Sequence, residues 1–129
     1  MKRDFLRLFG AAAFSCAISL YASAHHGTAA YDMDHPIALK GRVTEFIWAN
    51  PHAQIYFDVK DAKGNLVHWS CETLSPGKLV RSGWSKDSLK AGDQATITVM
   101  PAKNGSPVGF LTKLAFADGR ELALDEKPQ

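Results

Sequence analysis

The chain has 129 residues, of which 46% are hydrophobic and 22% are charged, and its formal net charge is +2. This length is typical of one domain with a modest core. Three of its 15 basic residues and one of its 13 acidic residues lie within the first seven positions, so positions 25–129 carry 12 of each. Such a balanced chain has no broad basic field, which argues against a protein that binds nucleic acid or an acidic membrane surface.

The first 24 residues have the pattern of a secretory signal peptide. The first seven are rich in basic residues, residues 8–21 are almost wholly apolar, and Ala22-Ser23-Ala24 has the small side chains of a cleavage site. The apolar run is shorter than the roughly 20 residues that span a bilayer. We therefore expect export to the periplasm and cleavage after Ala24, with no membrane anchor afterwards. The Sec and twin-arginine routes both stay open.

The mature chain would begin with an extended arm, residues 25–36, which shows no clear periodicity. The folded domain is expected over residues 37–124. Residues 125–129 are charged and polar and are expected to form a frayed tail.

Alternating apolar and polar residues predict three strands in the first half of the domain, at residues 37–48, 52–60 and 66–73. Val43 and Phe46 fall out of phase in the first strand, so we expect a β-bulge near Thr44. A proline cannot donate to a sheet ladder, so pairing should break at the corner Asn50-Pro51-His52. This corner would present His52 at the start of the second strand.

A short helix is expected after the third strand. Pro76 suits the first helical position, and Gly83 suits the left-handed residue that ends a helix. Leu79 and Val80 would form the narrow apolar side of this helix. Trp84, just after its end, would fold back onto it.

Two main strands, at residues 95–99 and 108–116, and a short strand at 120–124 complete the pattern. In the longer of them one face is expected to be lined by Val108, Phe110, Thr112, Leu114 and Phe116. Three strands, a helix and two or more strands follow the order of an OB-type barrel. The expected fold class is therefore mainly β: a small OB-like, five- to six-stranded antiparallel barrel with one short helix between strands three and four.

Cys71 would be the one cysteine of the mature chain, because Cys16 leaves with the signal peptide. An exported domain of this kind has no internal disulfide and depends on its core. Cys71 is in phase with Val67 and Trp69, so we expect a small buried hydrophobic residue rather than a reactive thiol or a metal ligand.

The five histidines are the most concentrated chemical signal, and all of them follow Ala24. Imidazole is the commonest protein ligand for transition metals. After cleavage at Ala24, the α-amine and the ring of His25 would chelate one metal ion, and His26 or His52 would add a further imidazole. The sequence thus predicts a copper-binding module with His25, His26 and His52 as ligands. Further contacts are expected from Asn50, Tyr56, His68 and Glu72.

Two other interpretations stay open. The protein would bind a small ligand or a protein partner without metal, through the loop and face around Trp48 and Tyr56, or it would be a hydrolase that uses Glu72. The chain has no nucleophile elbow, no Gly-rich phosphate loop and no zinc-protease motif, so a binding role is favoured over catalysis.

Five short motifs occur in a fixed order along the chain: Ala24-His25-His26-Gly27, Leu39-Lys40-Gly41-Arg42-Val43, Trp48-Ala49-Asn50-Pro51-His52, Trp69-Ser70-Cys71-Glu72, and Gly83-Trp84 with Leu89-Lys90-Ala91-Gly92-Asp93. Together they resemble a family of small exported bacterial proteins, domain-of-unknown-function family 6152. The usual His-His-Ser opening of that family is His-His-Gly here. The resemblance implies export and a single barrel-like domain, and it brings no activity with it.

Overall fold

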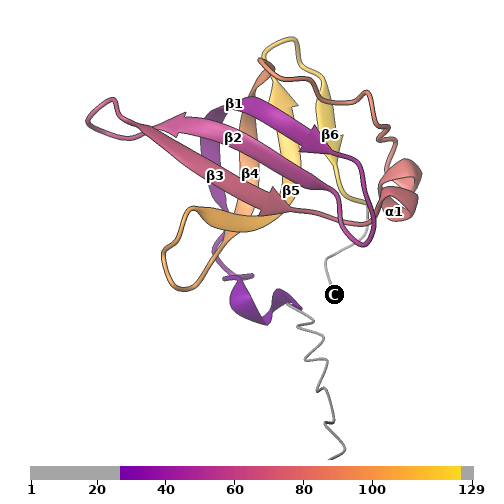
Figure 1. Ribbon diagram of the computed structural model, residues 1–129, viewed down its shortest axis with the longest axis horizontal. Helices are drawn as coiled ribbons and strands as arrows, with labels where there is room; N and C mark the ends of the chain where they lie inside the picture. The colour runs from indigo at the N-terminus through magenta and orange to yellow at the C-terminus, as the bar shows by residue number, and fades with distance from the viewer. Residues whose placement is uncertain (1–26, 126–129) are drawn as a thin grey trace, which may run out of the picture.

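The computed structural model describes residues 27–125, which form a β-barrel with one short α-helix (Figure 1). The expected signal peptide, His25, His26 and the last four residues of the expected tail lie outside this range. The elements, in chain order, are η1 Thr28–Ala30, β1 Ile37–Ile47, β2 Gln54–Lys60, β3 Leu66–Glu72, α1 Pro76–Arg81, β4 Gln94–Pro101, β5 Val108–Phe116 and β6 Glu121–Ala123.

β1 is the central strand, because it pairs antiparallel with β2 on one side and with β4 on the other. The strand order is β3-β2-β1-β4-β5-β6. Residues 70–72 of β3 also pair with residues 108–110 of β5, and this short pairing, here called the seam, closes five strands into a barrel. The predicted fold class is confirmed, with the difference that the seam is parallel.

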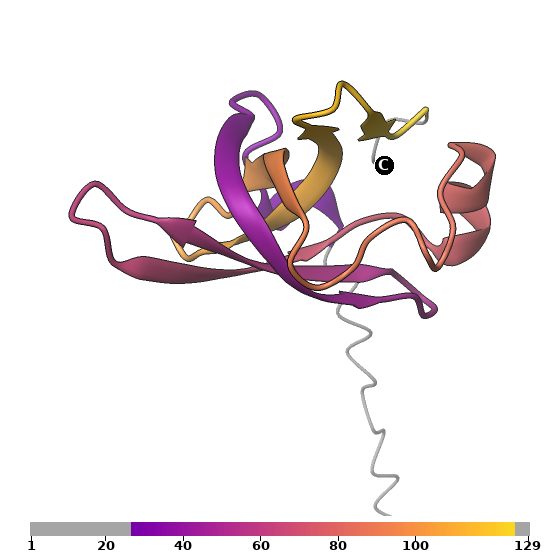
Figure 2. The same ribbon diagram turned by 90° about the horizontal axis from the view of Figure 1, so that it is seen from above.

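The two ends of the barrel differ in what they carry. The β2–β3 hairpin extends at one end, and α1 lies at the other (Figures 1 and 2). The η1 turn lies beneath the barrel in Figure 1, on the side of β5. The loops between β1 and β2 and before α1 therefore meet at the α1 end, away from the hairpin tip.

The predicted bulge in β1 is confirmed. Val43 pairs with Phe57, and Glu45 pairs with the next residue along, Tyr56, so Thr44 is the additional residue. The bulge reverses the alternation of the strand. As a result Val43 is fully buried and Phe46 also packs against the core.

The core is formed by inward-facing residues of all five barrel strands, with Phe57, Ile97 and Leu111 fully buried at its centre. Cys71 is 1% exposed, which confirms its predicted burial. Thr73, the buried polar residue that follows β3, donates its hydroxyl to the carbonyl oxygen of Leu111 at 2.9 Å. This buried hydroxyl therefore has a hydrogen-bond partner within the core, as buried polar groups usually do.

The predicted alternation of β5 is wrong in its first half. The register with β4 shifts between Thr98 and Val99, which inserts one additional residue into β5. Phe110 and Leu111 are both buried, as is Leu114 three residues later, whereas Val108 is exposed. A bulge changes which side chains face inward, and the sequence pattern of β5 alone does not reveal it.

The helix begins and ends as predicted, with Pro76 in its first turn and Gly83 at φ 82° just beyond it. Trp84 is 2% exposed and donates its indole N–H to the carbonyl oxygen of Ala123 in β6 at 3.0 Å, so its side chain is buried beside β6. Whether it also packs onto α1 stays a prediction. Val80, however, is 59% exposed, because a helix of six residues buries only Leu79 against the barrel. Within residues 27–125, no helix is long and apolar enough to cross a membrane.

Gly109 offers a test of the close approach of β4 and β5. A Cβ atom added there would lie 2.7 Å from the carbonyl oxygen of Met100, a backbone atom that cannot move without disturbing β4. We expect Gly109→Ala to lower the free energy of unfolding by about 1–3 kcal/mol, as overpacking does. Urea denaturation measures this change.

The matched control is Gly77→Ala in α1, where an added Cβ meets nothing within 4 Å. This change should leave stability unaltered or raise it by up to about 1 kcal/mol through helix propensity. Equal destabilisation by the two variants would contradict the tight approach of β4 and β5.

Candidate functional site

The carboxylate of Glu72 joins two segments that are distant in the sequence. The phenol of Tyr31 donates a hydrogen bond to Oε1 of Glu72 at 2.8 Å, and Nδ1 of His52 lies 3.1 Å from Oε2. Glu72 is the last residue of β3, Tyr31 follows η1, and His52 lies in the loop before β2. These three residues are called the Tyr–Glu–His cluster below.

Backbone hydrogen bonds hold the N-terminal arm in place. Tyr31 forms an isolated antiparallel bridge with Ala102, and the amide of Asp32 donates to the carbonyl oxygen of Pro101 at 2.8 Å. The amide of Lys103 donates in turn to the carbonyl oxygen of Ala30 at 3.0 Å. The arm thus docks on the end of β4 and the loop after it.

The ring of Tyr31 adds a side-chain contact to this docking. It packs against Phe110, with ring centroids 6.3 Å apart and planes tilted by 53°. Burial, followed by the hydrogen bond to Glu72 and the negative charge of Glu72, raises the pKa of Tyr31 well above its ordinary value. The phenol therefore stays protonated and remains a donor to the carboxylate throughout the physiological range.

His52 is held through one nitrogen only. Nδ1–H donates to Glu72, since a carboxylate is an acceptor, and this fixes the neutral ring in the tautomer whose Nε2 carries a lone pair. The side chain of His52 is 46% exposed, against 21% for Glu72. Within residues 27–125, no hydrogen-bond partner is found for Nε2, which is the nitrogen of His52 that could bind a metal ion.

The other predicted contact residues lie apart from the cluster. His68 pairs through Nδ1 with Asp58, which lies opposite it in the β2–β3 ladder. Tyr56 donates its hydroxyl to Oε1 of Gln54 at 2.8 Å, and Asn50 is exposed in the corner before His52. Within residues 27–125, Glu72 is the one of the four additional residues whose side chain is hydrogen-bonded to a predicted ligand, His52.

Two residues of the alternative interpretations have internal contacts. The ring of Trp48 packs edge-on against Phe46, with centroids 5.8 Å apart, and so extends the core. Both oxygens of Glu72 are engaged, by Tyr31 and by His52, so neither is an unoccupied base.

Cys71 lies next to Glu72 but points into the core. Burial raises the pKa of its thiol to about 12. The thiol is therefore protonated at neutral pH, and its burial keeps it away from the surface on which the cluster lies. Within residues 27–125, no group of three or more His, Cys, Asp or Glu side chains is arranged to hold a metal ion.

Tyr31 is the residue that sequence reasoning missed. The arm shows no periodicity, and the partners Tyr31 and Glu72 are 41 residues apart, so no local pattern connects them. The available signal was composition, because Tyr31 is the single aromatic residue between positions 25 and 36. A lone aromatic residue in a polar arm is a reasonable candidate for a docking contact.

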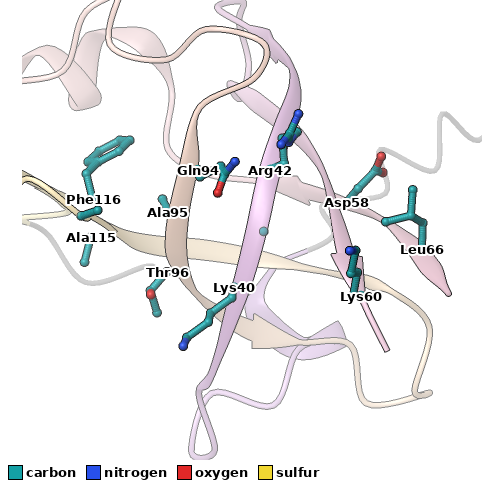
Figure 3. Close-up of a pocket in the computed structure, with 12 residues that line it drawn as sticks. Lys40, Arg42, Asp58, Lys60, Leu66, Gln94, Ala95, Thr96, Ala115 and Phe116 are labelled. Atoms are coloured by element: carbon teal, nitrogen blue, oxygen red, sulfur yellow. The ribbon is translucent and has the colours of Figure 1, made fainter. Parts of the chain in front are cut away.

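A second feature is a groove of about 920 Å³ on the outer face of the sheet, lined mainly by residues of β1, β2 and β4 (Figure 3). Its polar side chains occupy the outward positions of strands whose inward positions form the core.

Comparison with known proteins gives a family match but no annotated relative. A family model described as "Family of unknown function (DUF6152)" matches residues 13–112. No curated protein and no solved structure matches the chain.

The variant Tyr31→Phe tests whether the phenol of Tyr31 holds the arm on the barrel. Loss of the phenol removes the hydrogen bond to Glu72, which should loosen the arm while the barrel stays folded. We expect faster hydrogen exchange at the amides of Asp32 and Lys103, both of which take part in docking.

Tyr56→Phe is the matched control, because its hydroxyl contacts Gln54 on the exposed face of the sheet. Exchange at the two docking amides should be unchanged in this variant. If Tyr31→Phe leaves these amides as protected as in the parent chain, the phenol does not hold the arm.

Proposed function

As a member of the DUF6152 family, whose function is unknown, the chain has to be interpreted from its own residues, and we propose that it is an exported, periplasmic metal-binding module. The metal is Cu(II), and the ligands are His25, His26 and His52. Nitrogen donors suit Cu(II), which stands at the top of the affinity order for divalent first-row metals.

The observation that carries the proposal is the hydrogen bond between His52 and Glu72. Histidines that bind metal almost always donate their second ring N–H to a carboxylate, a carbonyl group or water, which fixes the tautomer and makes the ligating nitrogen more basic. Glu72 accepts this hydrogen bond from Nδ1 of His52 at 3.1 Å, and the side chain of His52 is about half exposed. In this proposal Glu72 orients a ligand and does not itself bind the metal.

The hydrogen bond from Tyr31 supports the contribution of the arm. Tyr31 contacts the same carboxylate as His52, and it is only five residues after His26. His25 and His26 directly precede Gly27, the first residue described. In this proposal the arm carries these two histidines to the exposed ring of His52.

Processing of the chain determines the terminal chelate. Cleavage after Ala24 would free the α-amine of His25, and this amine together with the His25 ring would bind one Cu(II) ion. His52 would supply a further nitrogen from the barrel, with His26 as the other imidazole of the arm. The chelate formed by the α-amine and the ring of His25 cannot bind metal before the signal peptide is removed, because this amine is then part of a peptide bond.

Calorimetric titration with Cu(II) tests the proposal on protein whose mass shows that it begins at His25. We expect one ion per chain, with a dissociation constant below micromolar and an electron paramagnetic resonance spectrum of nitrogen ligands. His52→Ala should weaken binding by at least about tenfold, and Glu72→Gln by about ten- to a hundredfold, as loss of an orienting partner does.

His68→Ala is the matched control, because His68 also pairs through Nδ1 with a carboxylate yet lies elsewhere on the sheet. It should bind Cu(II) like the parent chain. Binding no tighter than micromolar would end the proposal. Unchanged binding by a chain with one additional residue before His25 would exclude the terminal chelate.

A further inference from the structure

The groove on the outer face of the sheet has an unusual concentration of basic residues. Lys40 and Arg42 lie on either side of Gly41 on β1, and Lys60 is the last residue of β2. Figure 3 shows the two β1 side chains in the middle of the groove and Lys60 beside them. Within residues 27–125, none of these three side chains has a hydrogen-bond or ion-pair partner.

The acidic residue that lines the groove offsets only one of these three positive charges. Asp58 lies opposite Arg42 in the β1–β2 ladder, and its carboxylate is also hydrogen-bonded to His68 on β3. The surface is therefore locally positive on a chain whose positions 25–129 carry equal numbers of acidic and basic residues. A local field of this kind suits a small anion better than a polyanion, which requires a broad basic surface.

The ends of the groove are apolar. Leu66, 55% exposed, lies at one end, and Phe116 lies at the other (Figure 3). The guanidinium of Arg120 stacks over the ring of Phe116 at 4.1 Å from its centroid, so a fourth basic residue stands at this rim. At about 920 Å³ the groove is within the size range of small-molecule sites, and it is far larger than an inorganic anion needs.

We propose that this groove is a second binding site, for an organic anion that carries one anionic head group on an apolar body. Lys40, Arg42 and Lys60 would bind the head group, and Leu66 or Phe116 would contact the body. The site is separate from the Tyr–Glu–His cluster, since Gln54 and Lys60 are at opposite ends of β2, roughly 20 Å apart. It does not depend on metal binding.

Titrations of ¹⁵N-labelled protein, processed as the cell processes it, test this site with three probes. Decanoate below its micellar concentration carries an anionic head on an apolar chain, decyltrimethylammonium carries a cationic head on the same chain, and inorganic phosphate has no apolar part. We expect decanoate to shift the amide resonances of residues 40–42, 58–60 and 94–96, and the other two probes to leave them in place.

Variants then assign the shifts to the groove. Arg42→Gln combined with Lys60→Gln should weaken decanoate binding by about tenfold or more, which corresponds to about 1.4 kcal/mol. Lys63→Gln, which removes an exposed charge in the turn after β2 and outside the groove, should leave binding unchanged. Thermal denaturation shows whether each variant is folded, so a loss of binding is not mistaken for a loss of structure.

Three results would overturn the proposal. Equal binding of the cationic detergent would exclude recognition of the head group by charge, and equal shifts with phosphate would exclude a role for the apolar ends. Unchanged affinity in the double variant would place the ligand elsewhere. Tighter binding of a single-stranded oligonucleotide than of decanoate at these resonances would assign the groove to another class of partner.

Discussion

The parallel seam between β3 and β5 is the constraint on which both the barrel and the candidate site depend. Without its three residue pairs the sheet would stay open, with β3 at one edge. Its last pair is Glu72 opposite Phe110, and Tyr31 contacts both residues, one through a hydrogen bond and the other through its ring. Barrel closure and arm docking thus place the carboxylate where it also meets His52.

Two different groups of side chains lie at opposite ends of the outer face of the barrel. At the end near α1, a histidine and a carboxylate lie beside the docked arm, and at the other end of β2 basic side chains surround a groove. Strand alternation makes this possible, because Ile55 and Phe57 fill the core while Asp58 and Lys60 face outward. The seven residues of β2 therefore serve both the core and the groove, and the loop before β2 supplies His52.

Local patterns predicted the local features of this fold. The bulge at Thr44, the burial of Cys71 and the two ends of α1 all follow from residues close in sequence. The residues of β5 that face inward were not predicted correctly, because the bulge in β5 is visible only in its register with β4. The contact between Tyr31 and Glu72 could not be predicted either, since it depends on how the arm docks. Whether His25 and His26 bind metal stays a prediction.

Only the last three residues of β3 take part in the seam. Residues 66–69 pair with β2 alone within the described part of the chain, so one row of their backbone N–H and C=O groups has no strand beside it. Such a row is a template for edge-to-edge aggregation. Here it is four residues long, and Lys60 and Lys63 flank it in the hairpin. Short length and lysine charge are the protections that natural sheets use, so the hairpin keeps the barrel from polymerising through this edge.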